Sequence, residues 1–152
     1  MFITFEGIDL SGKSTQIKLL QNYLEKKNIN VISVRDPGST GISERIRDIL
    51  LDKDHFKMEY LTEFFLFSSS RQQLTKEVIL PYLKKKYFVL SDRYFDSSTA
   101  YQGYGGMIDL KTIKNVNKIA SDGLIPDLTF LINISIDECL KRKKLIIEDL
   151  LL

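Results

Sequence analysis

The sequence contains a single cysteine, Cys139, among its 152 residues. One cysteine cannot form a disulfide within the chain, and it cannot assemble a metal cluster built from several cysteine ligands. Disulfides are typical of oxidising compartments, whereas a chain without them suits a reducing one. We therefore expect a cytoplasmic protein.

Strong charge and long apolar runs are also missing. The net charge is only +2, whereas proteins that bind nucleic acids usually carry a basic face or stripe. No apolar run reaches the roughly 18 residues that predict a membrane span. The acidic Glu6 lies where a signal peptide would have basic and apolar regions. We expect neither nucleic acid nor membrane as a partner. The mild positive charge is compatible with small anionic ligands.

The pattern of apolar residues predicts one α/β domain over residues 1–152. Hydrophobic residues make up 43% of the chain, enough for a buried core. Four short apolar runs predict buried strands, at residues 2–5, 31–34, 87–90 and 128–134. Amphipathic stretches predict helices, at residues 14–27, 42–51, 58–85, 110–121 and 137–144. This alternation predicts a parallel β-sheet flanked by helices on both faces.

A glycine-rich segment follows the first predicted strand, at the sheet edge where α/β proteins bind ligands. It matches the phosphate-loop pattern G-x-x-x-x-G-K-[ST], and the predicted phosphate-binding residues are Gly7, Ile8, Asp9, Leu10, Ser11, Gly12, Lys13, Ser14 and Thr15. In such a loop, backbone N–H groups surround an anion, Lys13 reaches the outer phosphates and Ser14 offers a hydroxyl to Mg²⁺. Leu10 occupies a variable position, and its side chain can point outward. The alternative is a turn without a ligand.

Asp92 ends the third apolar run, where a carboxylate can hold Mg²⁺ directly or through water. A turn or helix cap is the structural alternative for such an aspartate. A GTPase would need the guanine-reading pattern Asn-Lys-x-Asp, but the segment that begins at Asn117 has Ala120 in place of the final aspartate. We therefore exclude that class.

Two further motifs place charged and aromatic groups near the predicted cleft. The segment from Arg35 and Asp36 to Gly38 forms a rigid Pro-Gly turn that could aim both side chains at the site, or it is a plain turn. Phe67 and Arg71 are four residues apart in a predicted helix, so they share a face. An aromatic plane beside a guanidinium suits a flat base, although Phe67 alone would more often be core.

Arg93 follows Asp92 directly and can hold a phosphate by a bidentate contact, with a structural ion pair as the alternative. The predicted loop after it supplies small hydroxyls, an amide and an aromatic wall, from Ser97, Ser98, Tyr101 and Gln102. Together with Arg35, Asp36, Phe67 and Arg71, these side chains are the candidates for binding a ligand in the predicted cleft.

Four segments carry a resemblance to the thymidylate kinase family: FEGIDLSGKST, RDPGST, LFSSSRQQL and SDRYFDSSTAYQG. They occur in the order and spacing of that family, and the resemblance extends to about residue 144. It implies a P-loop kinase fold that transfers the γ-phosphoryl of ATP to dTMP with Mg²⁺, and it suggests a homodimer through helices. The rival interpretations are a kinase for another nucleoside monophosphate and a nucleotide-binding remnant without turnover.

The resemblance also implies a role for each matched residue. Phe67 and Arg71 match the thymine platform and the base-reading arginine, and Tyr101 matches the aromatic residue that crowds the ribose 2′ position. Asp9 matches the acid that contacts the acceptor sugar, and Ser98 lies where the family contacts the base. Asp36 stands where the family usually has glutamate, which contacts the acceptor nucleotide and its metal or water shell. The implied catalytic residues are Lys13, Arg93 and Asp9, and Arg35 joins Arg93 on the acceptor phosphate.

The resemblance ends after about residue 144. The family continues with a lid motif, a fifth strand and further helices, whereas this chain ends in Leu145–Leu152, of which six residues are apolar. Family members place a catalytic arginine at the position of Leu10 or in the lid, and residues 141–144 lie only at the entrance of that lid. We therefore expect a domain shortened at its C-terminus, with little kinase activity and low stability.

Overall fold

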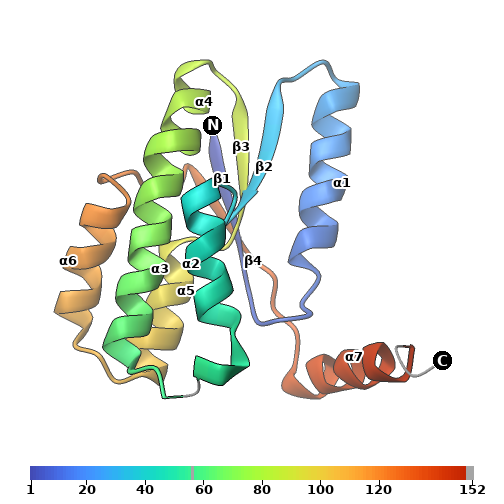
Figure 1. Cartoon of the computed structure of the whole chain (residues 1–152). Coiled ribbons are helices and arrows are strands. Elements are labelled where there is room, and N and C mark those ends of the chain that lie inside the picture. Colours follow the sequence, from blue (N-terminus) through green and yellow to red (C-terminus); the bar gives the residue numbers. More distant parts are fainter. Residues whose placement is uncertain (56, 150–152) are drawn as a thin grey trace.

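The structure is a computed structural model that describes residues 1–55 and 57–149. Its centre is a four-stranded sheet in the order β2-β3-β1-β4 (Figure 1). The strands are β1 Phe2–Glu6, β2 Val31–Arg35, β3 Phe88–Asp92 and β4 Leu128–Leu131. Every pair of neighbouring strands is parallel, which confirms the predicted α/β class with a parallel sheet.

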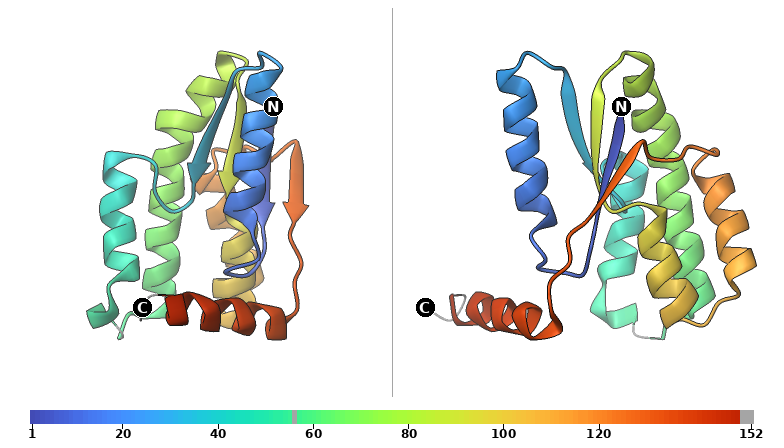
Figure 2. Two further views of the ribbon diagram at one scale, coloured as in Figure 1. Left: turned by 90° about the vertical axis from the view of Figure 1, so that its right-hand side faces the viewer. Right: turned by 180° about the vertical axis from the view of Figure 1, so that it is seen from behind.

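Helices cover both faces of this sheet, as predicted. Helix α1 lies on one face, helices α2, α3, α5 and α6 lie on the other, and α7 runs beneath the end where the strands finish (Figures 1 and 2). The α-helices are α1 Lys13–Lys26, α2 Gly41–Leu51, α3 Tyr60–Leu74, α4 Leu80–Lys84, α5 Phe95–Ser98, α6 Leu110–Ala120 and α7 Ile136–Asp149.

Two hydrophobic clusters form the core, one on each face of the sheet. They follow from the alternation of side chains along β1. Phe2 packs with Leu74 and Ile79 on the α3 side, whereas Ile3 packs with Ile17 of α1 on the other side. Because β1 and β3 are the central strands, they lie between both clusters, and their carboxyl ends are held in a fixed position.

The prediction of a buried strand over residues 128–134 is wrong in length and in burial. Strand β4 ends at Leu131, and its side chains are exposed, with Phe130 at 41% and Leu131 at 71%. β4 forms one edge of the sheet and pairs only with β1, and α1 packs against the other three strands. An apolar run alone does not distinguish an edge strand from a central one.

Two helical segments also differ from the prediction. The helix predicted over 58–85 is divided by a π-helical turn, Thr75–Ile79, and Pro81 lies at the start of α4, where its missing N–H costs least. The predicted loop after Arg93 is helical instead, because α5 continues into a π-helical segment, η3 Thr99–Gly105. Serine and glycine favour helices weakly, so the sequence pattern did not indicate this helix.

The C-terminal helix extends further than predicted. α7 continues to Asp149, beyond residue 144, while residues 150–152 of the apolar tail lie outside the described residues. Over residues 1–55 and 57–149, no helix has the length and apolar character needed to cross a membrane.

Candidate active site

The phosphate-loop segment joins β1 to α1 through a series of left-handed residues. Gly7 and Gly12 have φ angles of 146° and 100°, which glycine adopts without strain. A Cβ at Gly7 would also lie 2.5 Å from the carbonyl oxygen of Ile132. Leu10 has a φ of 61°, so it holds a left-handed conformation that costs about 1–2 kcal/mol for a residue with a side chain. The loop therefore keeps its shape despite Leu10.

Lys13 lies over this loop and is almost fully buried. Its Nζ donates to the carbonyl oxygens of Gly7 and Ile8 at 3.1 and 2.9 Å. Burial lowers the pKa of the Lys13 ammonium, and the nearby positive charge of Arg93 acts in the same direction. A buried ammonium group in the first turn of a helix is suited to an anionic ligand such as a phosphate.

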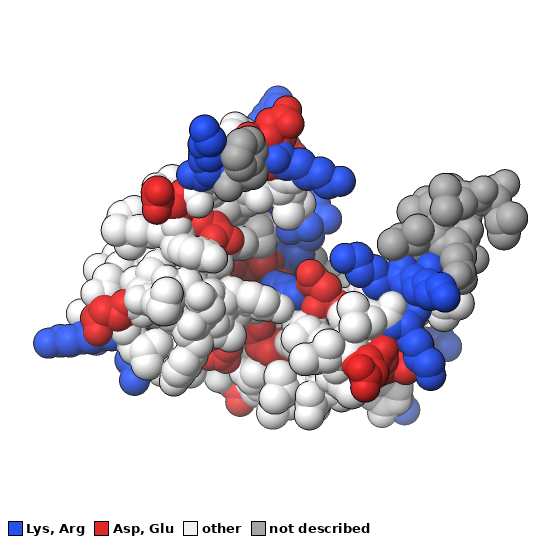
Figure 3. Space-filling model, turned by 90° about the horizontal axis from the view of Figure 1, so that it is seen from below, with Lys and Arg blue, Asp and Glu red and all other residues white. Residues whose placement is uncertain are grey.

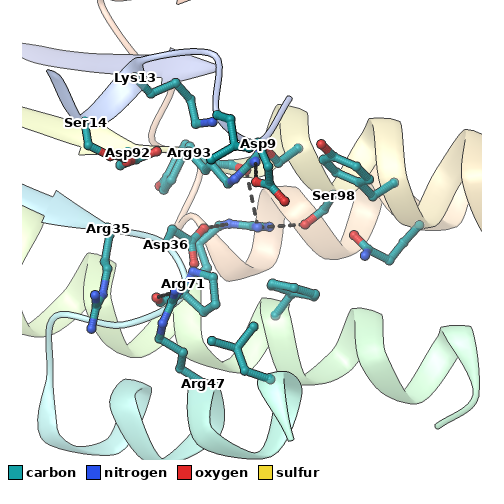
Figure 4. A pocket seen from close by; sticks show the side chains of 18 of the residues that line it. Asp9, Lys13, Ser14, Arg35, Asp36, Arg47, Arg71, Asp92, Arg93 and Ser98 are labelled. Carbon is teal, nitrogen blue, oxygen red and sulfur yellow. Dashed lines mark hydrogen bonds and ion pairs between the residues drawn. The ribbon is translucent and has the colours of Figure 1, made fainter. Parts of the chain in front are cut away.

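Ser14 and Asp92 meet directly beside the loop. The hydroxyl of Ser14, in the first turn of α1, donates to Oδ2 of Asp92, the last residue of β3, at 2.8 Å. Figure 4 shows the two side chains pointing toward one another. Both groups are hard oxygen donors, the type that Mg²⁺ prefers.

Arg93 connects the end of β3 to the phosphate loop. Its Nη1 donates to the carbonyl oxygen of Gly7 and to the Ser97 hydroxyl, both at 2.9 Å, and Nη2 donates to Oδ1 of Asp9 at 2.6 Å. The guanidinium also lies 5.4 Å from the ring centroid of Tyr101. These contacts hold a cation at the centre of the cleft.

Arg71 is 1% exposed and lies in a buried polar network. Its Nε donates to Asp36 at 2.5 Å, Nη1 donates to Oδ1 of Asn117 at 2.8 Å, and Nη2 donates to the Ser98 hydroxyl at 2.7 Å. Burial raises the pKa of the Asp36 carboxyl, and the Arg71 charge opposes this shift. The second oxygen of Asp36 is buried and has no hydrogen-bond partner among the described residues.

These groups line one cavity of about 960 Å³ at the carboxyl ends of the strands. Seen from below, the space-filling view shows a hollow in which basic and acidic side chains meet (Figure 3). A second cavity of about 490 Å³ lies between the phosphate loop and α7. Leu10, Lys13 and Ser14 line both cavities, so they mark the junction between the two.

Helix α7 is bonded to the carbonyl groups of the phosphate loop. The Cys139 thiol donates to the carbonyl oxygen of Asp9 at 3.3 Å, and Nη1 of Arg142 donates to that of Leu10 at 3.0 Å. Arg142 is held in turn by Glu138 at 2.7 Å. These bonds place Arg142 of α7 beside the second cavity.

The sequence model of the family described as thymidylate kinase matches residues 5–148. The chain belongs to the thymidylate kinase family. It is 48% identical to the thymidylate kinase of Thermoanaerobacter sp. (strain X514) over 142 residues, which are 93% of this chain and 70% of that protein. It is 50% identical to that of Sulfurihydrogenibium sp. (strain YO3AOP1) over 141 residues, 93% of this chain and 69% of that protein. The crystal structure of thymidylate kinase from Ehrlichia chaffeensis has a TM-score of 0.81 and 42% identity, covering 88% of this chain and 74% of that one.

In this member of the thymidylate kinase family, the structure brings every predicted substrate-binding residue to the larger cavity: Asp9, Arg35, Asp36, Phe67, Arg71, Arg93, Ser97, Ser98, Tyr101 and Gln102. Within the predicted phosphate loop, Gly12 and Thr15 line the second cavity instead. Gly7, Ile8 and Ser11 line neither cavity. Arg35 lies apart from Arg93 and pairs with Glu44 at 2.8 Å (Figure 4).

Sequence reasoning missed several polar residues of the site, among them Arg47, Asn117 and Glu6; Glu63 and Lys143 also line the cavity. Arg47 lines the cavity and donates to the carbonyl oxygen of Pro37 at 3.0 Å. Asn117 holds Arg71 from α6, and Glu6 accepts hydrogen bonds from the segment after β3. A signal existed for two of them: Asn117 lies four residues after Ile113 on the buried face of α6, and Glu6 is a charged residue at the end of a buried strand. A polar side chain at a core position is informative because its burial is costly.

Proposed function

We propose that this chain is an ATP- and Mg²⁺-dependent kinase that moves the γ-phosphoryl group of ATP to dTMP and forms dTDP. One geometric observation supports the proposal in addition to family membership. Side chains of the phosphate loop line the same cavity as Phe67 and Arg71. Ser14 and Asp92 lie together at one end of it, and Ser98 lies at the other (Figure 4). A nucleotide acceptor in this cavity would have its phosphate near the donor loop.

On the donor side, residues 7–15 would hold the phosphates of ATP. The backbone N–H groups of the loop would face the phosphates, and the N-terminus of α1 adds partial positive charge. Lys13, which bonds the carbonyls of Gly7 and Ile8, would exchange those bonds for stronger ones to phosphate oxygens. Lys13 would thereby stabilise charge that develops during transfer.

On the acceptor side, most predicted residues would contact one part of dTMP. Arg93 would hold the phosphate, and Asp9 would accept from the sugar. Arg35 would join Arg93 by leaving its ion pair with Glu44. The ring of Tyr101, beside Arg93, would crowd a ribose 2′-hydroxyl. The base would stack on Phe67 and bond to three polar side chains that line the cavity, Arg71, Ser98 and Gln102. Arg71 fits this role because Asp36, Asn117 and Ser98 already fix its orientation. Asp36 would contact the acceptor nucleotide and its metal or water shell, and Ser97 would act through its bond to Arg93.

Mg²⁺ fits the pair formed by Ser14 and Asp92. Their oxygen atoms are 2.8 Å apart, and no group of three or more acidic, histidine or cysteine side chains suited to a metal occurs in residues 1–55 and 57–149. Such a site suits Mg²⁺, which binds one or two protein ligands together with substrate phosphates and water. The ion neutralises phosphate charge when it is bound.

The transfer step needs positioning more than a strong base. A bond forms between the γ-phosphorus and a phosphate oxygen of dTMP, the bond to the bridging oxygen breaks, and the electron pair leaves with ADP. The attacking oxygen is already an anion, so no proton has to be removed. Arg93 is bonded to both Gly7 and Asp9 and would therefore align the acceptor phosphate with the loop.

We also propose a homodimer in the cytoplasm. Exposed apolar side chains on the outer helices support the dimer, with Ile49 on α2 at 42%, Leu61 on α3 at 45% and Phe65 on α3 at 49% exposed. Analytical ultracentrifugation should give twice the monomer mass, and Phe65→Glu should shift the equilibrium toward monomers. The lone thiol of Cys139 suits a reducing compartment.

A substrate panel tests the proposed reaction. Purified chain with ATP and Mg²⁺ should phosphorylate dTMP in preference to dUMP, dCMP, dGMP and AMP, at the low rate expected for a shortened domain. In calorimetry, dTMP should bind far better than its ribonucleotide. Preference for another monophosphate would assign a different acceptor. Nucleotide binding without any product would identify a remnant without turnover.

A further inference from the structure

Glu6 is a buried carboxylate that the proposed contacts with substrate do not use. It ends β1, is 5% exposed, and does not line the larger cavity. Burying a carboxylate is costly unless hydrogen bonds compensate for the lost water. The burial of the Glu6 carboxylate therefore has to be explained by its hydrogen-bond partners.

Both oxygens of Glu6 accept hydrogen bonds from the segment that follows β3. The backbone N–H of Tyr94 donates to Oε1 at 2.8 Å, and the Ser97 hydroxyl donates to Oε2 at 2.6 Å. Burial raises the pKa of the Glu6 carboxyl, and these two bonds oppose the rise; Asp96 and Arg93 are the charged groups that face it. One side chain thus links β1 to the start of α5.

The turn that Glu6 holds has an unusual backbone. Arg93 has a φ of 69°, a left-handed conformation that a residue with a side chain adopts only where the surroundings impose it. The N–H of Arg93 is bonded to the carbonyl of Phe5 at 3.0 Å, and the N–H of the next residue, Tyr94, is bonded to Glu6. Consecutive N–H groups on both sides of the strained residue are therefore fixed by the end of β1.

A second connection runs from Glu6 to the guanidinium of Arg93. Ser97 gives its hydroxyl proton to Glu6, and the same oxygen accepts from Nη1 of Arg93 at 2.9 Å. The carboxylate thus fixes the direction of the Ser97 lone pairs, which in turn orient Arg93. Hydrogen bonds in such a chain strengthen one another.

We propose that Glu6 is a positioning residue for Arg93: its carboxylate fixes the turn after β3 and, through Ser97, aims the guanidinium at the acceptor phosphate. The inference rests on the proposed function, since it concerns the group that would hold the phosphate of dTMP. It predicts an effect that depends on the phosphate of the ligand and not on its base.

Glu6→Gln is the primary test because it keeps the shape of the side chain and an oxygen for the N–H of Tyr94. The new amide group would face Ser97 as a donor, so the Ser97 hydroxyl would lose its acceptor and its fixed orientation. In calorimetry the affinity for dTMP should fall about tenfold, the size of one charge-assisted hydrogen bond, while the affinity for thymidine stays unchanged. The KM for dTMP should rise by the same factor, and the KM for ATP should not change.

Thr4→Val is the matched control. Thr4 lies two residues earlier on the same face of β1, is fully buried, and its hydroxyl is bonded to that of Thr129 at 2.8 Å. This variant removes a partly buried hydrogen bond from the same strand without reaching Arg93. Its melting temperature should fall, and its affinity for dTMP should equal that of the natural chain.

Ser97→Ala tests the connection without altering β1, which covers the case in which Glu6→Gln does not fold. It should lower dTMP affinity by a similar factor, and the double variant should be no worse than either single one. Equal losses for dTMP and thymidine, additive effects in the double variant, or unchanged dTMP affinity would each overturn the positioning role. A natural chain that neither binds nor phosphorylates dTMP would overturn the proposed function, and with it this inference.

Discussion

The hydroxyl of Ser14 and the carboxylate of Asp92 are joined by a 2.8 Å hydrogen bond, although 78 residues separate them in the chain. Ser14 lies in the helix that follows β1, and Asp92 is the last residue of β3. Because β1 and β3 are neighbouring parallel strands, the fold brings the two side chains together at one edge of the sheet.

Removal of the Ser14 hydroxyl or the Asp92 carboxylate should raise the Mg²⁺ concentration that turnover requires. Asp92→Asn and Ser14→Ala should each lower turnover about a hundredfold at limiting Mg²⁺, since the metal would lose a ligand that orients it. Excess Mg²⁺ should restore part of the activity. The control is Asp122→Asn, which removes an exposed ion pair with Lys76 and should leave the Mg²⁺ dependence as it is. Identical Mg²⁺ titrations for all four proteins would contradict the assignment.

Lys13→Met should abolish most phosphoryl transfer while the chain stays folded. The substitution deletes a charge at the phosphates but keeps the apolar stem of the side chain, so we expect turnover to fall about 10²–10³-fold. Lys18→Met, on the exposed face of the same helix, provides the control. Circular dichroism checks that both variants keep the fold, and unchanged turnover in Lys13→Met would mean that the loop does not act on ATP.

Arg71→Ala should destabilise the fold as well as weaken the binding of the base. Without the guanidinium, Asp36 is left as an unpaired buried carboxylate, which costs about 3–5 kcal/mol. The double variant Arg71→Ala/Asp36→Asn should recover part of this stability, but it should not recover dTMP affinity. Chemical denaturation measures the first effect and calorimetry the second. Equal stability of the single and double variants would show that the pair is not coupled.

Leu10→Gly should be more stable than Leu10→Ala, the reverse of the usual order. Both variants remove the same side-chain contacts, but only glycine accepts a φ of 61° without strain, so we expect a difference of about 1 kcal/mol. Thermal denaturation of the two variants under the same conditions shows which one is more stable. A more stable alanine variant would show that residue 10 is not held in the left-handed conformation.

Tyr94 should make stability fall steeply between pH 10 and 12. Burial raises the pKa of its hydroxyl from 10.0 to about 12. In this window the unfolded chain loses the proton while the folded chain keeps it, so the stability of the folded state decreases by about 1.4 kcal/mol per pH unit. Tyr94→Phe lacks the hydrogen bond with Thr75 and should be less stable at neutral pH. The gap between the two proteins should narrow as the pH rises through this window, and a constant gap would contradict the shift.

The phosphate loop and the central strands could be predicted because local rules determine them. Gly7, Gly12 and Lys13 have to occur at fixed spacing for a strand to turn into a helix around an anion, and β1 and β3 are buried on both faces, so their apolar runs are unambiguous. Strand β4 has a similar run, but its place at the edge depends on the order of strands. That order is a property of the whole fold.

The buried polar network could not be predicted because its members come from separate elements. Arg71 on α3 bonds Asp36 after β2, Ser98 on α5 and Asn117 on α6. The sequence indicates that Arg71 shares a helix face with Phe67, and both do line the cavity. The role of Asn117 follows only from the approach of α6 to α3. The helical form of residues 95–105 was missed because serine and glycine carry weak helix signals.

The position of Arg93 between the phosphate loop and the larger cavity has a thermodynamic consequence. The same guanidinium bonds the carbonyl of Gly7 and the carboxylate of Asp9, so a ligand that draws Arg93 toward the cavity alters the loop, and a ligand that reshapes the loop alters Arg93. The two ligands are then energetically linked through one side chain. Linkage is reciprocal: by whatever factor ATP changes the dissociation constant of dTMP, dTMP changes that of ATP by the same factor.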